Sequence, residues 1–239
     1  MTPKLRLLSQ VSLRLRRIAL SLVMGMGVLA HAGGMEDDPL RATILADRLE
    51  WQATDGDPVA WDIAAYAGYD LNKLYFYSEG STQSDETESE NELLYSRAVT
   101  PFWDVQGGVE VDQAGSGHET WGVVAVQGLA PYFIDTRIRL KIGEKAVGVN
   151  FDFEYEALLT QRLILTPRIE MEAYSDDVPE LGIGSGFSSL GLGLRLRYEF
   201  VREFAPYIGV EYVNSFGDTK DLYGGREDTR FVTGVRFWF

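Results

Sequence analysis

Charged residues recur at every second position along several segments in the last third of the chain. Side chains two apart in a strand point to the same face, so each run would place a row of charges on one side of a sheet. The rows contain both signs. They could pair as a ladder of salt bridges that fills an interior, or form rings that select or conduct ions. The candidate members of this network are Asp152, Glu154, Glu156, Arg162, Arg168, Glu170, Glu172, Arg195, Arg197, Glu199, Glu211, Arg230 and Arg236.

Metal-binding side chains are scarce by comparison. The chain has no cysteine, which excludes thiolate metal sites and disulfides. The acidic run at residues 84–90 offers the oxygen ligands that hard cations prefer. It lacks the glycine and spacing of a calcium loop, however, so a solvated charged loop is the simpler interpretation. The candidate metal ligands are Met35, His118, Asp85, Glu86, Glu88 and Glu90.

His118 is the only histidine after residue 32, and it lies in an expected loop, GSGHET. A Ser-His-Asp hydrolase needs a nucleophile beside its base. Ser116, two residues away in a glycine-containing loop, is a poor partner, and a solvated surface histidine is the more common case. We therefore expect no catalytic residues and a protein that is not an enzyme. A membrane-embedded hydrolase using His118 is the third-ranked hypothesis.

The N-terminus has the three parts of a secretory signal peptide. An apolar core, Ile18 to Ala30, is too short for a stable membrane anchor, which is the alternative interpretation. Ala30-His31-Ala32 fits a cleavage site. The basic region before the core consists of Lys4, Arg6, Arg14, Arg16 and Arg17. We expect residues 1–32 to be removed and residues 33–41 to form a short periplasmic tail.

The remaining chain is strongly acidic. The whole sequence has 22 Lys and Arg against 36 Asp and Glu, a net charge of −14. The signal peptide holds five of the basic residues and no acid, so 17 remain against 36 and the net charge becomes −19. Nucleic-acid binding needs a positive surface and is excluded as a function. The charge favours a surface that faces cations.

The last twelve residues, DTRFVTGVRFWF, alternate strictly. One face carries an almost wholly apolar row and the other carries Arg230 and Arg236. This is the pattern of a strand with lipid on one side and a polar lumen on the other. The terminal Phe239, with Phe237, also resembles the assembly signal that the barrel assembly machinery of the outer membrane reads.

Alternation of the same kind continues back to about residue 42 and predicts an all-β fold. We expect a closed antiparallel transmembrane barrel over residues 42–239, with outer-membrane lipid around it. Aromatic residues near the strand ends, Tyr207 among them, suggest two interfacial girdles. The predicted strands are 42–52, 59–69, 72–80, 91–99, 101–112, 119–128, 131–142, 146–157, 160–174, 187–200, 204–214 and 228–239.

The connections between these strands give an independent indication. Every second connection is tight, whereas the others are mostly longer and polar, including STQSDETESEN and QAGSGH. The exception is GEK, which is short. Transmembrane barrels have short periplasmic turns and longer extracellular loops. The even number of strands would place both termini in the periplasm.

Several segments resemble the copper resistance protein B family of Gram-negative outer membranes. The resembling segments are ELLYSRAVTPFWDVQGGV, VQGLAPY, EYEALLTQRLILTPRIE, GIGSGFS, GLRLRYEFVREFAPYIGVE and DTRFVTGVRFWF. The resemblance implies an outer-membrane β-barrel in copper homeostasis, with copper as its ion and periplasmic copper-binding proteins as partners. Members commonly carry a His- and Met-rich stretch before the barrel. Here that stretch is only GGMEDDPL, with Met35 as its one candidate ligand, so no obvious ligand cluster supports copper.

The sequence thus predicts a cell outer-membrane protein of copper homeostasis or resistance, exported through a cleaved signal peptide. It would mediate or gate copper passage, or sequester copper, at the outer membrane. The alternative is a structural or general small-ion channel without copper specificity.

Overall fold

The computed structural model describes residues 38–239 except residues 55, 84–85 and 226. Residues 38–239 form one compact unit. The expected signal peptide and Met35 lie outside the described residues. Among the described residues, no helix has the length and apolar character needed to cross a membrane.

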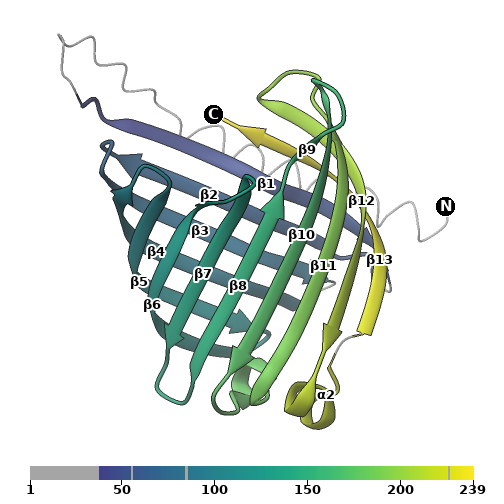
Figure 1. The fold of residues 1–239 in the computed structure, drawn as a ribbon. Helices are drawn as coiled ribbons and strands as arrows, with labels where there is room; N and C mark the ends of the chain where they lie inside the picture. Colours follow the sequence, from purple (N-terminus) through teal and green to yellow (C-terminus); the bar gives the residue numbers. More distant parts are fainter. Residues whose placement is uncertain (1–37, 55, 84–85, 226) are drawn as a thin grey trace, which may run out of the picture. The chain divides into compact units, whose positions relative to one another are not determined.

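The described chain is a closed antiparallel barrel, as predicted (Figure 1). Strand β9 pairs with the same strand, β10, as β8 does, and therefore continues β8 beyond an interruption at Glu156. The barrel consequently has twelve strands. They are β1 (Arg41–Ala53), β2 (Val59–Gly68), β3 (Asn72–Gln83), β4 (Glu86–Thr100), β5 (Trp103–Ala114), β6 (Gly117–Ala130), β7 (Ile134–Ile142), β8 (Val147–Tyr155) with β9 (Ala157–Leu158), β10 (Leu163–Tyr174), β11 (Gly186–Tyr198), β12 (Phe204–Ser215) and β13 (Glu227–Trp238).

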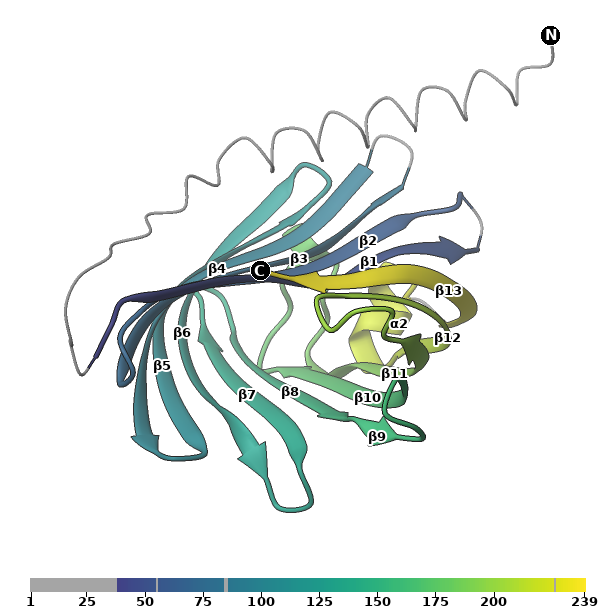
Figure 2. The same cartoon turned by 90° about the horizontal axis from the view of Figure 1, so that it is seen from above.

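The first and last strands close the barrel. β13 pairs with β1 from Leu45 opposite Trp238 to Ala53 opposite Phe231, with one irregularity near Asp47. The backbones of Ile44 and Phe239 exchange two hydrogen bonds of 3.1 and 2.9 Å. Figure 2, which looks along the barrel, shows β13 beside β1 in the ring. The terminal phenylalanine therefore belongs to the closing seam.

The two faces of the strands divide as the alternation predicts. On β13, Phe231 is 70% exposed and faces outward, whereas Arg230 is 7% exposed and faces the interior. Because lipid surrounds a membrane barrel, an apolar side chain on the outer face is in a favourable environment. Tyr207 differs from its predicted place in an aromatic girdle, because it is buried and its hydroxyl donates to Glu50 inside the barrel.

The two ends of the barrel differ. The end that holds Phe239, at the top of Figure 1, has tight turns; we assign it to the periplasm. Residues 175–185 at the other end include a short 3-10 helix, η1 (Pro179–Leu181), and residues 216–226 include helix α2 (Gly217–Tyr223). These are the longest connections at the extracellular end.

Two predicted extracellular loops are instead strand. β3 runs to Gln83 and β4 begins at Glu86, so most of STQSDETESEN extends a hairpin. QAGSGH likewise contracts to a turn at Gly115 and Ser116 between β5 and β6. Polar residues in these segments look like loop residues in the sequence. They nevertheless satisfy their backbone hydrogen bonds by strand pairing beyond the apolar band.

Candidate functional site in the barrel interior

The interior is crossed by salt bridges that join strands far apart in the barrel. Among the described residues, nine bases and thirteen acids take part, so carboxylates are in excess. The bases are Arg48, Arg137, Arg139, Lys141, Arg168, Arg195, Arg197, Arg230 and Arg236. The acids are Asp47, Glu50, Asp62, Glu79, Glu90, Glu92, Glu110, Asp112, Asp152, Glu156, Glu170, Glu199 and Glu211.

Two arginines meet near the middle of the barrel. Arg48 of β1 lies 3.1 Å from Asp62 and 3.5 Å from Glu170, and also pairs with Glu79. Arg168 of β10 reaches across the interior to the same Asp62 of β2, at 3.2 Å. Asp62 therefore links two strands on different sides of the barrel, which ties the walls together and occupies the lumen between them.

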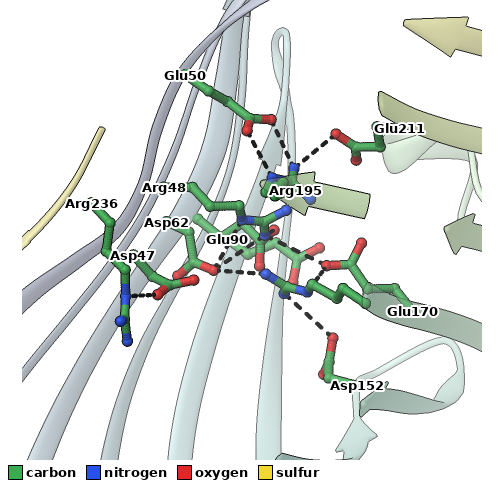
Figure 3. A network of polar contacts seen from close by, with 12 residues as sticks. Asp47, Arg48, Glu50, Asp62, Glu90, Asp152, Glu170, Arg195, Glu211 and Arg236 are labelled. Atoms are coloured by element: carbon green, nitrogen blue, oxygen red, sulfur yellow. Dashed lines mark hydrogen bonds and ion pairs between the residues drawn. The ribbon is translucent and has the colours of Figure 1, made fainter. Parts of the chain in front are cut away.

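A second group surrounds Arg195 of β11. Its guanidinium donates two hydrogen bonds to Glu50, at 3.1 and 3.0 Å, and one to Glu211 at 3.1 Å (Figure 3). Arg230 also donates to Glu211, at 3.4 Å. All four of these side chains are buried. Two-point contacts of this kind are favoured between arginine and carboxylate because the guanidinium is planar and forked.

A third group lies nearer the extracellular end. Arg139 of β7 donates to Glu92 at 2.8 Å, and Arg137 donates to the same carboxylate at 2.6 Å. Lys141 is fully buried. It lies 3.1 Å from Glu90 and 3.5 Å from Asp112, and it also pairs with Glu110.

The carboxylates around Lys141 are the one described group arranged to hold a metal ion. One oxygen from each of Glu90, Glu110 and Asp112 lies within 4.8 Å of the others. The ammonium of Lys141 lies within ion-pairing distance of all three, so a protein cation already neutralises part of their charge. The group is therefore a salt-bridge centre as it stands.

The extracellular mouth is filled by apolar side chains. Val178, in the connection between β10 and β11, is fully buried in a cluster with Leu94, Trp121, Val123 and Tyr174. The connection is held by Lys145, which pairs with Glu180, and by a hydrogen bond of 2.9 Å from the amide of Gly184 to Thr219 of α2. This inward-folded segment, residues 175–185, is called the mouth loop below.

Two cavities lie among the charged groups. One, of about 250 Å³, is lined by Gln127, Gly128, Leu129, Asp135, Thr136, Arg137, Asp152, Phe153, Glu154 and Arg168. The other, of about 20 Å³, is lined by Asp47, Arg48, Glu154, Thr166, Arg195, Arg197, Tyr207 and Arg236. Glu154 borders both, so the two cavities adjoin.

Most of the predicted charge network faces the interior. Arg230 meets Glu211 at 3.4 Å, and Arg236 meets Asp47 at 2.6 Å and Glu156 at 3.5 Å. Arg197 joins Glu156 at 2.7 Å and Glu199 at 3.7 Å. Glu172 is held by neutral groups, since Asn150 and Ser189 donate to it at 2.9 and 3.0 Å.

Arg162 does not belong to the network. It lies in the exposed turn before β10, one residue outside the strand, and its side chain pairs with no described residue. The alternation of β10 is correct, but the strand begins only at Leu163, after this position.

The predicted metal ligands do not form a site. Glu86, Glu88 and Glu90 lie in β4 and not in a loop, and Glu90 faces Lys141 and Arg139 inside the barrel. His118 lies in β6 opposite Gln113 and is exposed, not in a loop. Met35 and Asp85 lie outside the described residues.

The predicted network does not include the charged residues of the first seven strands. Glu92, Glu110 and Asp112 alternate with Leu93, Val109 and Val111, which is the same signal that identified the later rows. The mouth loop gave no such signal, because a buried Val178 in a polar connection has no periodicity to reveal it.

Comparison with known proteins identifies the family. The family model described as copper resistance protein B precursor matches residues 40–239, which include all twelve strands. The chain belongs to the copper resistance protein B family. Copper resistance protein B of Escherichia coli is 39% identical over 213 residues, covering 86% of this chain and 72% of that protein. A copper resistance protein B homolog of Pseudomonas syringae pv. tomato (strain ATCC BAA-871 / DC3000) is 37% identical, covering 88% and 74%.

A solved structure supports the fold independently. The KdgM porin aligns with a TM-score of 0.52 at 16% identity, covering 82% of this chain and 99% of the porin. With the copper resistance protein B match and the barrel itself, this places the protein in the outer membrane. The precursor in the family description agrees with the expected signal peptide.

The side chains of the described lumen suit some copper species better than others. Cu²⁺ binds nitrogen and oxygen ligands more tightly than the other divalent first-row metals do. Carboxylate oxygens are abundant here. The soft ligands that favour Cu⁺ are not, because Met171 lies on the outward face of β10 by alternation and the chain has no cysteine.

Proposed function

We propose that this protein works in copper homeostasis as a gated path for copper ions through the outer membrane. The interior charge network is the path, and the mouth loop is the gate at the extracellular end. The observation that carries the proposal is the excess of carboxylates inside a barrel of the copper resistance protein B family. A lumen with more acidic than basic groups attracts cations and repels anions.

The arrangement of the network supports gating more than free passage. The cross-barrel pairs made by Arg168 and Arg195 occupy the lumen, and the mouth loop fills its outer end. An ion could pass only if side chains or the loop moved. Arg48 has three carboxylates within ion-pairing distance, so it could change partners without being left unpaired.

The proposed role is not enzymatic. His118 makes no hydrogen bond to a nucleophilic side chain among the described residues. Ser116 lies in the exposed turn before it. Replacing His118 by Ala should therefore leave the function intact, and loss of function in a correctly folded His118→Ala variant would revive the hydrolase hypothesis.

The direct test is a deletion strain complemented by the wild-type gene. We expect deletion to change copper tolerance and cellular copper content, and complementation to restore both. Nickel and zinc tolerance provide the control for a general defect of the outer membrane. An unchanged copper phenotype would contradict the proposal.

A second candidate function is a structural barrel or a general small-ion channel. The observation in its favour is that the interior donors described here are oxygen atoms, which distinguish copper poorly from other divalent cations. Conductance in planar bilayers without a preference for Cu²⁺ would support this alternative. A lumen that stays sealed to all ions would exclude a general channel.

A further inference from the structure

The larger cavity forms a vestibule at the periplasmic side of the network. Its liners come from the periplasmic halves of β6 and β7 and from β8 and β10, and Asp135 at its edge is exposed. Its volume of about 250 Å³ is far above the roughly 10–15 Å³ that a single water molecule needs. The space therefore suits a small ion that keeps its first hydration shell.

The cationic side chains of the vestibule already have partners. Arg137 pairs with Glu92, and its guanidinium lies 3.9 Å from the ring centre of Tyr77. Arg168 pairs with Asp62 at 3.2 Å and with Glu170 at 2.5 Å. These positive charges are consequently neutralised within the network and leave little attraction for an anion.

Two carboxylates of the vestibule lack such partners. Asp135 and Glu154 make no hydrogen bond or ion pair with any described residue. They lie directly opposite each other on β7 and β8. Like charges opposite each other on neighbouring strands destabilise a sheet, and a cation between them removes that cost.

The smaller cavity extends the same site inward. With a volume of about 20 Å³ it has room for one water molecule, and Glu154 borders it. Thr166 also lines it. The side chain of Thr166 is only 5% exposed, and its hydroxyl has no hydrogen-bond partner. A buried hydroxyl without a partner calls for a ligand or a water that it can bind.

Beyond this point the path is blocked by closed salt bridges. Arg48, Arg195 and Arg236 line the small cavity, and each is paired with a carboxylate: Asp62, Glu50 and Asp47, respectively. A cation drawn in from the periplasm by Asp135 and Glu154 would have to displace these pairs to move further. The vestibule is thus open at its entrance and closed at its inner end, which is the arrangement of a holding site.

We propose that the periplasmic vestibule binds one hydrated divalent cation between Glu154 and Asp135. Its water shell is held from the inside by the hydroxyl of Thr166. Only the choice of Cu²⁺ as the ion rests on the proposed function. The site itself rests on the cavity, the unpaired carboxylates and the unpartnered hydroxyl.

Copper binding by the purified, refolded barrel tests the proposal. The variants are Glu154→Gln and Asp135→Asn, which remove charge at nearly constant size, and Glu154→Asp, which keeps it. Glu203→Gln is the matched control, because Glu203 is an exposed carboxylate in the periplasmic turn between β11 and β12. Bound Cu²⁺ is counted by isothermal titration and by its electron paramagnetic resonance spectrum. In gel electrophoresis with sodium dodecyl sulfate, each variant should migrate more slowly after heating than before it, which shows that the unheated variant was folded.

We expect one Cu²⁺ site whose dissociation constant rises at least tenfold in Glu154→Gln and in Asp135→Asn. Glu154→Asp should retain most of the affinity, and Glu203→Gln should bind as the wild type does. Equal affinity in wild type and Glu154→Gln would overturn the proposal, and so would an equal loss in Glu203→Gln. Copper tolerance is measured in the same variants. If binding is lost while tolerance is unchanged, the site stands and the proposed role in copper passage fails.

Discussion

At the scale of single residues, four of the five buried arginines among the described residues serve more than one carboxylate, and Arg230 serves one. Arg195 holds Glu50 and Glu211, and Arg48 holds three acids from three strands. Burying a charge is costly unless it is paired and hydrogen-bonded. Removing one member of a buried pair should therefore lower the stability of the barrel strongly, whereas removing both members together should lower it much less.

Replacing Arg195 by Met should destabilise the barrel by about 3–5 kcal/mol, because Glu50 would remain buried without its main partner. Urea unfolding in lipid vesicles, followed by tryptophan fluorescence, measures this free energy.

The double variant Arg195→Met, Glu50→Gln is the control for that change. It removes both charges of the pair, while Glu211 keeps Arg230 at 3.4 Å. We expect it to regain a large part of the lost stability. If the double variant is no more stable than the single one, the pair does not act as a unit.

Residues of the site differ in how far the sequence could reveal them. The inward direction of Glu154, Glu170 and Arg195 follows from period-two alternation alone. Their partners do not, because Asp62 lies 106 positions before Arg168 and the two meet only through the closure of the barrel. The cavity beside Glu154 depends on side chains from four strands and has no local sequence signal.

At the scale of elements, the mouth loop depends on a close approach to the turn between β5 and β6. A Cβ atom at Gly117 would lie 1.9 Å from the backbone oxygen of Glu180. This clash could be relieved only if the mouth loop or the hairpin of β5 and β6 moved. Gly117 is therefore required for the loop to rest where it does.

Gly117→Ala should displace the mouth loop and raise the conductance of the barrel in planar bilayers, because the space at Gly117 is taken by the loop backbone. Amide exchange in residues 175–185 should accelerate in the same variant. Gly122→Ala, on the same strand, is the matched control, since its Cβ would lie 3.7 Å from the backbone oxygen of Ile142, an ordinary contact distance. Equal conductance in the two variants would show that the loop is not the barrier.

The mouth loop should also loosen in acid. The hydrogen bond from Lys145 holds the pKa of Glu180 below its ordinary value of 4.5, and the same contact raises the pKa of Lys145 above 10.5. A lowered carboxyl pKa stabilises the loop above about pH 4.5, and this stabilisation disappears as the pH falls through the lowered value. Lys145 loses its contribution only above pH 10.5.

We therefore expect amide exchange in the mouth loop, corrected for the intrinsic rate, to rise below pH 4.5 and to be flat between pH 5 and 9. The variant Glu180→Gln should show the fast exchange at every pH. Both groups are partly exposed, so the effect should be small and should weaken at high salt. An acid response that persists in Glu180→Gln would assign it to another group.

The strands were the most predictable elements, and the extracellular hairpins the least. Alternation placed all twelve strands, because lipid on one side and charge on the other impose a strict period of two. Beyond the apolar band that contrast vanishes, and Thr82 or Glu88 fits a strand or a loop equally well. Pairing within the hairpin then decides between strand and loop. As a result, β3 extends to Gln83 and β4 already begins at Glu86.

At the scale of the whole molecule, the barrel combines an apolar outside with an acidic inside. Closing the sheet turns twelve weak amphipathic strands into one wall without free edges, as lipid requires. The same closure gathers charges of distant segments into a common interior. The excess of carboxylates is therefore a property of the assembled barrel and not of any one strand.

This excess predicts the selectivity of the barrel once the mouth is open. With thirteen acids against nine bases in the described network, cations should be preferred over anions. The reversal potential of Gly117→Ala in a tenfold gradient of KCl measures the preference. The dilute side should be near 0.1 M, where charges act over about 10 Å.

Removing carboxylates from the lumen of that variant should then shift the reversal potential toward zero. Glu154→Gln and Asp135→Asn are the suitable additions, because both line the vestibule and neither pairs with a described base. Glu203→Gln, outside the lumen, should leave the potential unchanged. An anion preference in Gly117→Ala, or the same shift from all three additions, would show that the interior charges do not govern which ions enter, and would remove the electrostatic basis for a copper path through this barrel.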